Sequence, residues 1–224
     1  MKKQESSLLK KQPLKLCTSR LQLRQITAED TPAIVMLRSD PMAYRFFRRP
    51  HCLTPKEHIQ WYEKTYLADE NRFDWLALRD GSPIGLFGLN RLPGAPVEVE
   101  ISYLLAPQGQ GRGYVAEAVH ALLQWAVREW QGENAFAEIH RANRASLRFI
   151  RRMGFYLWKE CPPFLIFQKD LTSEANGLPA ICRLTEEVLG KVDKKIELPP
   201  TPEYRLLAAA FFARASEKKR GLAA

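Results

Sequence analysis

The sequence of 224 residues is poor in cysteine and has no long hydrophobic run. Its four cysteines stand singly, so they form neither a CxxC zinc motif nor a dense disulfide framework. This distribution favours a reducing compartment, and we expect a cytoplasmic protein. No stretch approaches the roughly eighteen apolar residues of a membrane span, and the basic start lacks the apolar core of a secretory signal. We therefore expect no contact with a membrane.

The sequence also lacks the residue spacing of a metal site. Its four histidines fall in different predicted elements, with no HxxxH pair and no cysteine at ligand spacing. They are His51, His58, His120 and His140. We interpret each as a structural or surface residue and predict no metal cofactor.

Positive charge is in excess, with 34 Lys and Arg against 25 Asp and Glu and a net charge of +9. Such a balance is typical of nucleic-acid-binding proteins. However, residues 1–24 hold seven basic residues and one acidic residue, whereas residues 25–172 hold 18 and 17. Because the excess belongs mainly to the N-terminal arm, we do not expect the main domain to bind nucleic acid.

The chain divides into three parts by composition and pattern. Residues 1–19 form a basic arm, residues 20–172 a domain, and residues 173–224 an extension that begins with a Ser-Glu-Ala-Asn-Gly linker. In the extension we expect a helix over residues 184–192, and apolar residues at helical spacing over residues 203–219 predict an amphipathic helix. The apolar face of the second helix must bury against the domain or against a second copy, so a homodimer through the C-terminal helices is one of the two alternatives.

Within residues 20–172, strand and helix patterns alternate, which predicts a mixed α/β domain. The clearest helix start is Thr54-Pro55-Lys56-Glu57, which has the residues of a capping box with proline in the first turn. Asp80-Gly81 between two apolar runs predicts a hairpin. Further strands are expected over residues 20–26, 97–105, 136–139, 155–160 and 164–171, and further helices over residues 27–38, 114–130 and 143–153.

A glycine-rich turn at residues 108–114 joins a predicted strand to a predicted helix. Glycines before a helix N-terminus let backbone amides approach an anion, and the helix dipole favours negative charge there. The turn is not a P-loop, because no Lys-Ser or Lys-Thr follows the glycines, and it is not a dinucleotide motif, because Tyr114 stands where GxGxxG has its last glycine. A plain tight turn is the alternative interpretation.

The order of these segments resembles the GNAT superfamily of N-acetyltransferases. The matching stretches are TSRLQLRQITAEDTPAI, SPIGLFGL, VEISYLLAPQGQGRGYVAEAV and NRASLRFIRRMGF, which span about two-thirds of the chain. The resemblance implies a central, mostly antiparallel sheet of about seven strands flanked by helices. Within the superfamily, the sequence is similar to two branches, the ribosomal-protein N-acetyltransferases and the amino-sugar N-acetyltransferases.

The family's pyrophosphate signature, Q/R-x-x-G-x-G/A, fits this chain in two registers. Residues 108–113 match it letter for letter, but residues 110–115, which end on Val115, align better with the Glu117-Ala118 that follows. We prefer the second register. The resemblance then implies that acetyl-CoA is the co-substrate and that its contacts come from Leu104, Leu105, Gln110, Gly111, Arg112, Gly113, Tyr114, Val115, Asn143 and Ser146. Asn143 is also a candidate helix N-cap.

Acetyl transfer to an amine requires a proton acceptor for the amine and stabilisation of the leaving thiolate. Many relatives carry a Glu at the position of Glu100, so we take Glu100 as the candidate base, with Glu98 on the same face of the strand as a second candidate. Many relatives place a tyrosine seven residues after the asparagine, but here that residue is Ile150. Tyr114 lies in another element, and we leave the acid unassigned.

The sequence therefore predicts an N-acetyltransferase that moves an acetyl group from acetyl-CoA to a primary amine by direct attack in a ternary complex. The acceptor is either a protein N-terminus or a small amine such as an amino sugar. The alternative is a catalytically inactive GNAT-like module that binds acyl-CoA, with Ile150 as the sign of lost chemistry. A nucleic-acid-binding protein is a third, less favoured interpretation.

Overall fold

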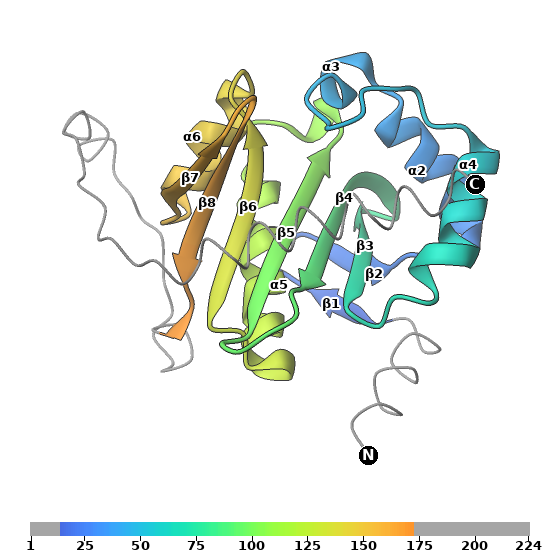
Figure 1. Cartoon of the computed structure of the whole chain (residues 1–224). Coiled ribbons are helices and arrows are strands. Elements are labelled where there is room, and N and C mark those ends of the chain that lie inside the picture. Colours follow the sequence, from blue (N-terminus) through green and yellow to red (C-terminus); the bar gives the residue numbers. More distant parts are fainter. Residues whose placement is uncertain (1–13, 173–224) are drawn as a thin grey trace, which may run out of the picture. The chain divides into compact units, whose positions relative to one another are not determined.

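A computed structural model of the chain describes residues 14–172, which contain one eight-stranded sheet (Figure 1). The strand order is β1-β2-β3-β4-β5-β6-β8-β7. Every neighbouring pair is antiparallel except β5 and β6, which run parallel. The mixed α/β, mostly antiparallel architecture is thus confirmed. The predicted C-terminal helices, and the homodimer that they would form, lie outside the described residues.

The strands are β1 (Lys15–Cys17), β2 (Gln22–Gln25), β3 (Arg72–Arg79), β4 (Ser82–Arg91), β5 (Glu98–Leu105), β6 (Asn134–His140), β7 (Tyr156–Cys161) and β8 (Phe164–Asp170). The α-helices are α2 (Thr31–Arg38), α3 (Pro41–Tyr44), α4 (Pro55–Trp61), α5 (Tyr114–Trp130) and α6 (Arg144–Arg152). Short helical turns complete them, namely η1 (Ala28–Asp30), η2 (Tyr62–Tyr66) and η3 (Pro107–Gly109).

The eighth strand is β1, which lies in the segment that we assigned to the basic arm, residues 1–19. It pairs with β2 over three residues, from Lys15 opposite Arg24 to Cys17 opposite Gln22. Three residues are too few for polar and apolar alternation to be recognised. The sheet therefore begins before the boundary that we placed at Arg20.

Side chains on the two faces of the sheet build two separate cores. On one face α5 and α6 pack over buried residues of the strands, and Trp75 and Phe73 lie against Trp125 of α5 at ring distances of 5.4 and 5.5 Å. On the other face α2 and the segment after α4 cover Leu76 with Ile34 and Tyr66. Helices thus flank the sheet on both sides, as the resemblance implied.

The predicted start of α4 is confirmed in detail. Thr54 Oγ1 accepts a hydrogen bond from Glu57 N at 3.3 Å, and Glu57 Oε2 accepts one from Thr54 N at 2.8 Å. One turn later, buried His58 meets the Thr31 hydroxyl at 2.9 Å through Nδ1. Within the described part of the chain His58 is therefore a packing residue that joins α4 to α2, in agreement with its structural interpretation.

Glu117 of α5 ties the β1–β2 turn to the beginning of this helix. Its carboxylate accepts hydrogen bonds from Arg20 N at 2.8 Å, Arg20 Nε at 2.7 Å and Ser19 Oγ at 3.1 Å, and also from the Thr18 hydroxyl. Burial alone would raise the pKa of Glu117, but these hydrogen bonds outweigh it and hold the pKa below its usual value. The ionised carboxylate is therefore the stabilising form.

We expect Glu117→Gln to lower the free energy of unfolding at pH 7 by about 1–2 kcal/mol, because the amide offers one acceptor oxygen instead of two and no charge. A carboxylate with a depressed pKa stabilises the fold above its unfolded pKa, and the contribution is lost as the pH falls through the folded value. The difference between wild type and variant should therefore shrink in acid. Urea unfolding at pH 7 and at pH 3 measures it.

The matched control is Glu129→Gln on the same helix, where the exposed carboxylate pairs only with neighbouring Arg128 in the structure. This variant should leave the stability within about 0.5 kcal/mol of wild type. Equal losses in the two variants would contradict the bracing role of Glu117.

Candidate active site

The two parallel strands at the middle of the sheet part from each other halfway along their length. β5 pairs with β6 only over Glu98–Asn134, Val99–Ala135 and Glu100–Phe136. Beyond that point β5 keeps β4 as its neighbour as far as Leu105, and β6 keeps β8 as far as His140. Figure 1 shows the two arrows diverging toward their carboxyl ends. The backbone groups on the facing edges are left to bind an extended ligand.

The glycine-rich turn closes the carboxyl end of β5 and leads into α5. Gly111 and Gly113 adopt the left-handed region at φ +73° and +78°, and Gly113 is the N-cap of α5. Residues 110–113 are exposed, and the space beside the Gly111 Cα is open. Because the first amides of a helix have no intrahelical acceptor, they are available to an anion. This arrangement fits the diphosphate of a nucleotide-bearing cofactor.

Of the residues that follow the glycines, Tyr114 faces the core. Its side chain is buried, its hydroxyl accepts a hydrogen bond from Arg79, and the Arg20 guanidinium lies 4.7 Å from its ring centre. Val115 is half-buried against the same core. Tyr114 and Val115 therefore have only their backbone amides to offer to a ligand. Arg20 also donates to the Arg112 carbonyl at 2.9 Å, so the turn is held from behind.

Across the opening, Asn143 is the N-cap of α6, as one of its two interpretations required. Its Oδ1 accepts a hydrogen bond from Ser146 N at 3.1 Å. The Ser146 side chain is half-buried in the first turn of the helix. Because α6 follows directly after β6, Asn143 and Ser146 lie on the opposite side of the opening from β5.

Leu104 and Leu105 close the far part of β5, opposite Leu86 and Gly85 of β4. Gly85 leaves room for them, because a Cβ on Gly85 would lie only 2.7 Å from the Leu104 carbonyl oxygen. The two leucine side chains point to opposite faces and join the two different cores. Any contribution of theirs to a ligand in the opening would therefore come from backbone groups.

Glu100 stands at the last paired position before the strands part. Burial raises its pKa to about 7, helped by the nearby Glu138 carboxylate and opposed by Arg72, the Asn90 side chain and Arg48. Asn90 is its cross-strand partner on β4. A carboxyl with this pKa exchanges a proton readily near neutral pH, which is the property required of a general base.

Glu98 lies on the same face of β5, two residues earlier, as the alternation predicted. It is buried, its Oε1 has no hydrogen-bond partner among the described residues, and burial raises its pKa. However, Glu98 is paired with Asn134 of β6, and the next residue, Val99, is paired with Ala135. Of the two carboxylates, Glu100 is therefore the one at the opening.

Sequence reasoning missed a polar cluster beside Glu100. Asp74 of β3 is buried and accepts a hydrogen bond from Arg72 Nε at 3.0 Å. Its carboxylate and the Ser102 hydroxyl fill the space above Gly88, where a Cβ would clash with both. The available signal was an aspartate inside the apolar run RFDWLAL, opposite a glycine of the stretch SPIGLFGL.

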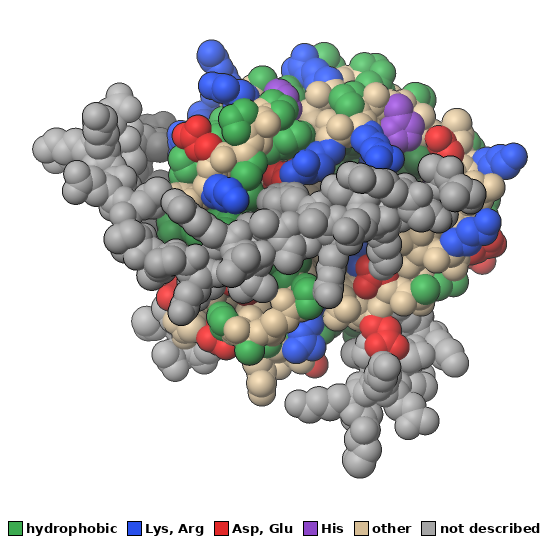
Figure 2. All heavy atoms as spheres, viewed as in Figure 1, with side chains coloured by type: hydrophobic (Ala, Val, Ile, Leu, Met, Phe, Trp, Pro, Cys, Tyr) green, Lys and Arg blue, Asp and Glu red, His purple; other side chains and the backbone are tan. Residues whose placement is uncertain are grey.

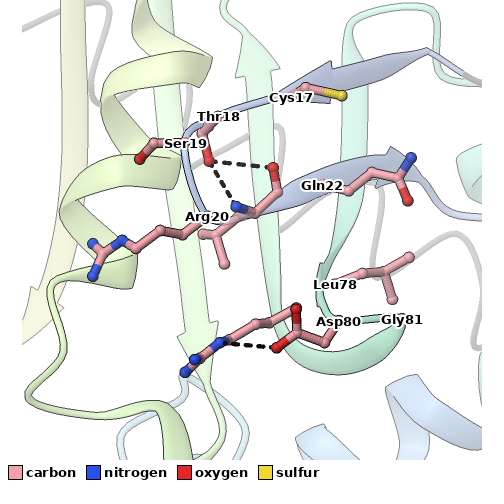
Figure 3. A pocket seen from close by; sticks show the side chains of 10 residues that line it. Cys17, Thr18, Ser19, Arg20, Gln22, Leu78, Asp80 and Gly81 are labelled. Carbon is pink, nitrogen blue, oxygen red and sulfur yellow. Dashed lines mark hydrogen bonds and ion pairs between the residues drawn. The ribbon is translucent and has the colours of Figure 1, made fainter.

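A separate hollow of about 470 Å³ lies between the β1–β2 turn and the β3–β4 turn (Figure 3). Thr18, Arg20 and Asp80 line it, and none of the site residues predicted from the sequence does. Its arginines are engaged, Arg20 with Glu117 and Arg79 with Asp80. Because no residue of β5 or β6 lines it, the hollow is separate from the opening between these strands.

Figure 2 shows basic side chains gathered on the upper half of the viewed face, with acidic ones scattered among them. The arginines in and just before α6 are exposed, as is Arg112. They are Arg141, Arg144, Arg148, Arg151 and Arg152. The outer face of α6 is therefore basic and open to solvent.

Comparison with known families decides the identity of the domain. The acetyltransferase (GNAT) domain matches residues 20–156. The chain belongs to this family. As a member of the GNAT family it is an N-acetyltransferase that uses acetyl-CoA as its co-substrate. The exposed glycine turn at the N-terminus of α5 has the open space and free amides that the CoA diphosphate requires.

Individual relatives are distant. The chain is 25% identical over 148 residues to an uncharacterised N-acetyltransferase, p20, of Bacillus licheniformis, which covers 62% of this chain and 81% of that protein. It is 28% identical over 145 residues to an uncharacterised protein of Methanocaldococcus jannaschii, but that match spans only 28% of the relative.

Solved structures share the fold. The ribosomal L7/L12 N-terminal acetyltransferase RimL superposes with a TM-score of 0.61 at 17% identity, over 70% of this chain and 94% of that one. FdhC, a nucleotide-linked sugar GNAT, superposes with a TM-score of 0.63 at 17% identity, over 73% and 93%. A further RimL structure contains coenzyme A.

No helix among residues 14–172 is long and apolar enough to span a membrane. No group of three or more His, Cys, Asp or Glu side chains in the same part of the chain is arranged to hold a metal ion.

We expect Gly111→Asp to weaken acetyl-CoA binding by about tenfold or more, roughly 1.4 kcal/mol, because it places a carboxylate beside the diphosphate. Isothermal titration with acetyl-CoA measures the effect. The control is Gly81→Asp, since Gly81 has nearly the same backbone angle, φ +76°, and equally open surroundings in the β3–β4 turn. Both variants should lose similar stability, and only Gly111→Asp should lose affinity. Equal affinities would exclude the turn as the diphosphate site.

Proposed function

We propose that this GNAT enzyme acetylates a primary amine by direct attack on acetyl-CoA in a ternary complex, with Glu100 as the general base. The observation that carries the proposal is the position of Glu100, half-buried at the point where β5 and β6 part, with a pKa of about 7. A general base is most effective when its pKa lies near the working pH.

Different residues of the opening bind different parts of acetyl-CoA. The amides of residues 111–115 bind the diphosphate, and the exposed Arg112 adds positive charge. The free backbone edge at Leu104 and Leu105 binds the pantetheine arm. Asn143 and Ser146, at the N-terminus of α6, lie beside the thioester end. Contacts of this kind place the acetyl group between β5 and β6, next to Glu100.

The reaction then follows from the position of the base. The amine nitrogen attacks the acetyl carbon, the C–N bond forms, and the C–S electron pair passes to sulfur. Glu100 takes the proton that the amine loses, and the thiolate leaves and is protonated from solvent, because its pKa is near 8.5. The products are an acetylated amine and CoA.

The acceptor enters from the face that carries Glu100. On that face Phe46 packs against His140 at the end of β6, with ring centres 5.9 Å apart, and Arg48 forms an ion pair with Glu138. Trp61, Tyr62 and Tyr66, which are also aromatic, pack in or against the core on this face of the sheet. We place Phe46 at the acceptor wall because it lies beside His140 at the end of β6.

Two acceptor classes fit this description, a protein N-terminus and a small amine such as an amino sugar. RimL, named for acetylating ribosomal protein L7/L12, and FdhC, a nucleotide-linked sugar GNAT, have the same fold at equal identity. Mass spectrometry after incubation with acetyl-CoA, a peptide panel and a panel of amino sugars separates the classes by the product that gains an acetyl group.

We expect Glu100→Gln to lower kcat/KM by about 10²–10⁴ at pH 8, because the amide cannot take the proton. The wild-type rate should fall as the pH drops below about 7, where Glu100 becomes protonated. The variant should lose the part of this acid limb that comes from Glu100, whereas protonation of the acceptor amine affects both enzymes alike. CoA release from acetyl-CoA in the presence of an identified acceptor, followed from pH 5.5 to 9, measures both effects.

Glu98→Gln is the matched control on the same face of β5. It should keep the acid limb, since Glu98 lies in the paired part of the strand. If Glu98→Gln abolished activity while Glu100→Gln left it intact, Glu98 would be the base instead. An enzyme that binds acetyl-CoA and modifies no acceptor would favour the inactive module.

A further inference from the structure

Tyr103 of β5 carries a buried hydroxyl that forms no hydrogen bond of good geometry with the described residues, although the Ser146 side chain lies close to it. A buried polar group without a partner is costly, and the rare examples call for an explanation. Its ring packs against Phe149 of α6 at 5.0 Å in an edge-to-face arrangement. The ring is therefore fixed, while the hydroxyl at its tip is unsatisfied.

The position of this hydroxyl is set by the parting of the strands. Tyr103 lies three residues beyond Glu100, so its side chain leaves β5 on the face opposite to the base. There it reaches across to α6, the helix that follows β6. Burial raises the pKa of the Tyr103 hydroxyl, and a weak hydrogen-bonding contact with the Ser146 side chain opposes this shift. The two hydroxyls thus approach each other from the two sides of the opening.

We propose that the Tyr103 hydroxyl donates a hydrogen bond to the sulfur of the thioester and stabilises the thiolate as it leaves, with Ser146 as its neighbour in the same role. The inference rests on the proposed function, because it requires acetyl-CoA to lie between β5 and β6. In this arrangement the thioester sulfur is the hydrogen-bond partner of the Tyr103 hydroxyl, and the hydroxyl stabilises the negative charge of the leaving thiolate.

Other groups do not fill this role. Ile150 stands where many relatives have a tyrosine, and it is fully buried in the core. The Tyr114 hydroxyl is buried in the core and accepts a hydrogen bond from Arg79. Tyr103 offers a donor of the same chemical kind from the facing strand.

The chemical step remains balanced. As the C–N bond forms and the C–S bond breaks, sulfur gains the electron pair and a negative charge. The Tyr103 O–H bond points its hydrogen at that charge without breaking. A raised pKa keeps the phenol protonated through the working range. Fixed donors of this kind stabilise the charge that develops in the transition state.

The thiol pKa of bound CoA tests the proposal without any acceptor. Free CoA titrates as an ordinary thiol, near 8.5. In the complex with wild-type enzyme we expect a pKa lower by about one unit, a tenfold shift toward thiolate, seen in the ultraviolet absorbance of the thiolate. Tyr103→Phe should return the value most of the way to that of free CoA, and Ser146→Ala should return it in part.

Tyr103→Phe keeps the ring that packs on Phe149, so its melting temperature should equal or exceed that of wild type, because an unsatisfied hydroxyl is removed. Tyr156→Phe, at an exposed position on β7, is the control and should leave the thiol pKa of bound CoA unchanged. A melting temperature lowered by several degrees in Tyr103→Phe would assign the hydroxyl a structural role instead.

The outcomes separate the two proposals. If wild-type enzyme did not bind CoA, the proposed function itself would fail. If CoA bound to wild type and to Tyr103→Phe with the same thiol pKa, the role of Tyr103 would be wrong while the proposed function stood.

Discussion

The parting of β5 from β6 is the constraint on which the rest of the domain depends. Up to Glu100 the two strands satisfy each other, and beyond it each keeps one partner and one free edge. Because α5 starts at the end of β5 and α6 starts just after β6, the parting directs two helix N-termini to the two sides of one opening. A single change in strand pairing therefore creates the free backbone edge and places both helix dipoles where a phosphate-bearing thioester can use them.

The charges around Glu100 are balanced so that neither protonation state dominates at neutral pH. Glu138 lies across the parting on β6 and disfavours a second negative charge, but its own charge is paired with Arg48. Arg72 favours ionisation of Glu100, yet it is shared with the buried Asp74. Because Glu138 and Arg72 have opposite charges and each is partly neutralised by its own partner, burial is the main influence on the pKa of Glu100. The tuning of the base thus involves residues on β3, β6 and the loop after α3.

Local signals in the sequence predicted the local structure. The Thr54 capping box, the Asp80-Gly81 hairpin and the glycines before α5 each specify backbone geometry within a few residues, and the structure has all three. What depends on contacts between distant segments was not visible. β1 is too short to show a pattern, and Asp74 is explained only by Gly88 on the next strand. The same holds for Tyr103, whose partnerless hydroxyl became evident only once α6 was placed against β5.

The basic excess of the sequence acquires a different meaning at the glycine turn. Arg20 lies behind this turn, but Glu117 neutralises its charge, and Arg79 is likewise paired with Asp80. These arginines act as braces that hold the Arg112 carbonyl and the Tyr114 ring, and through them the direction of the free amides. In the complex that we propose, the attraction for a diphosphate comes from the amides, the dipole of the 17-residue helix α5 and the exposed Arg112. Net charge is therefore a poor guide to this site, because backbone groups that carry no formal charge supply much of its field.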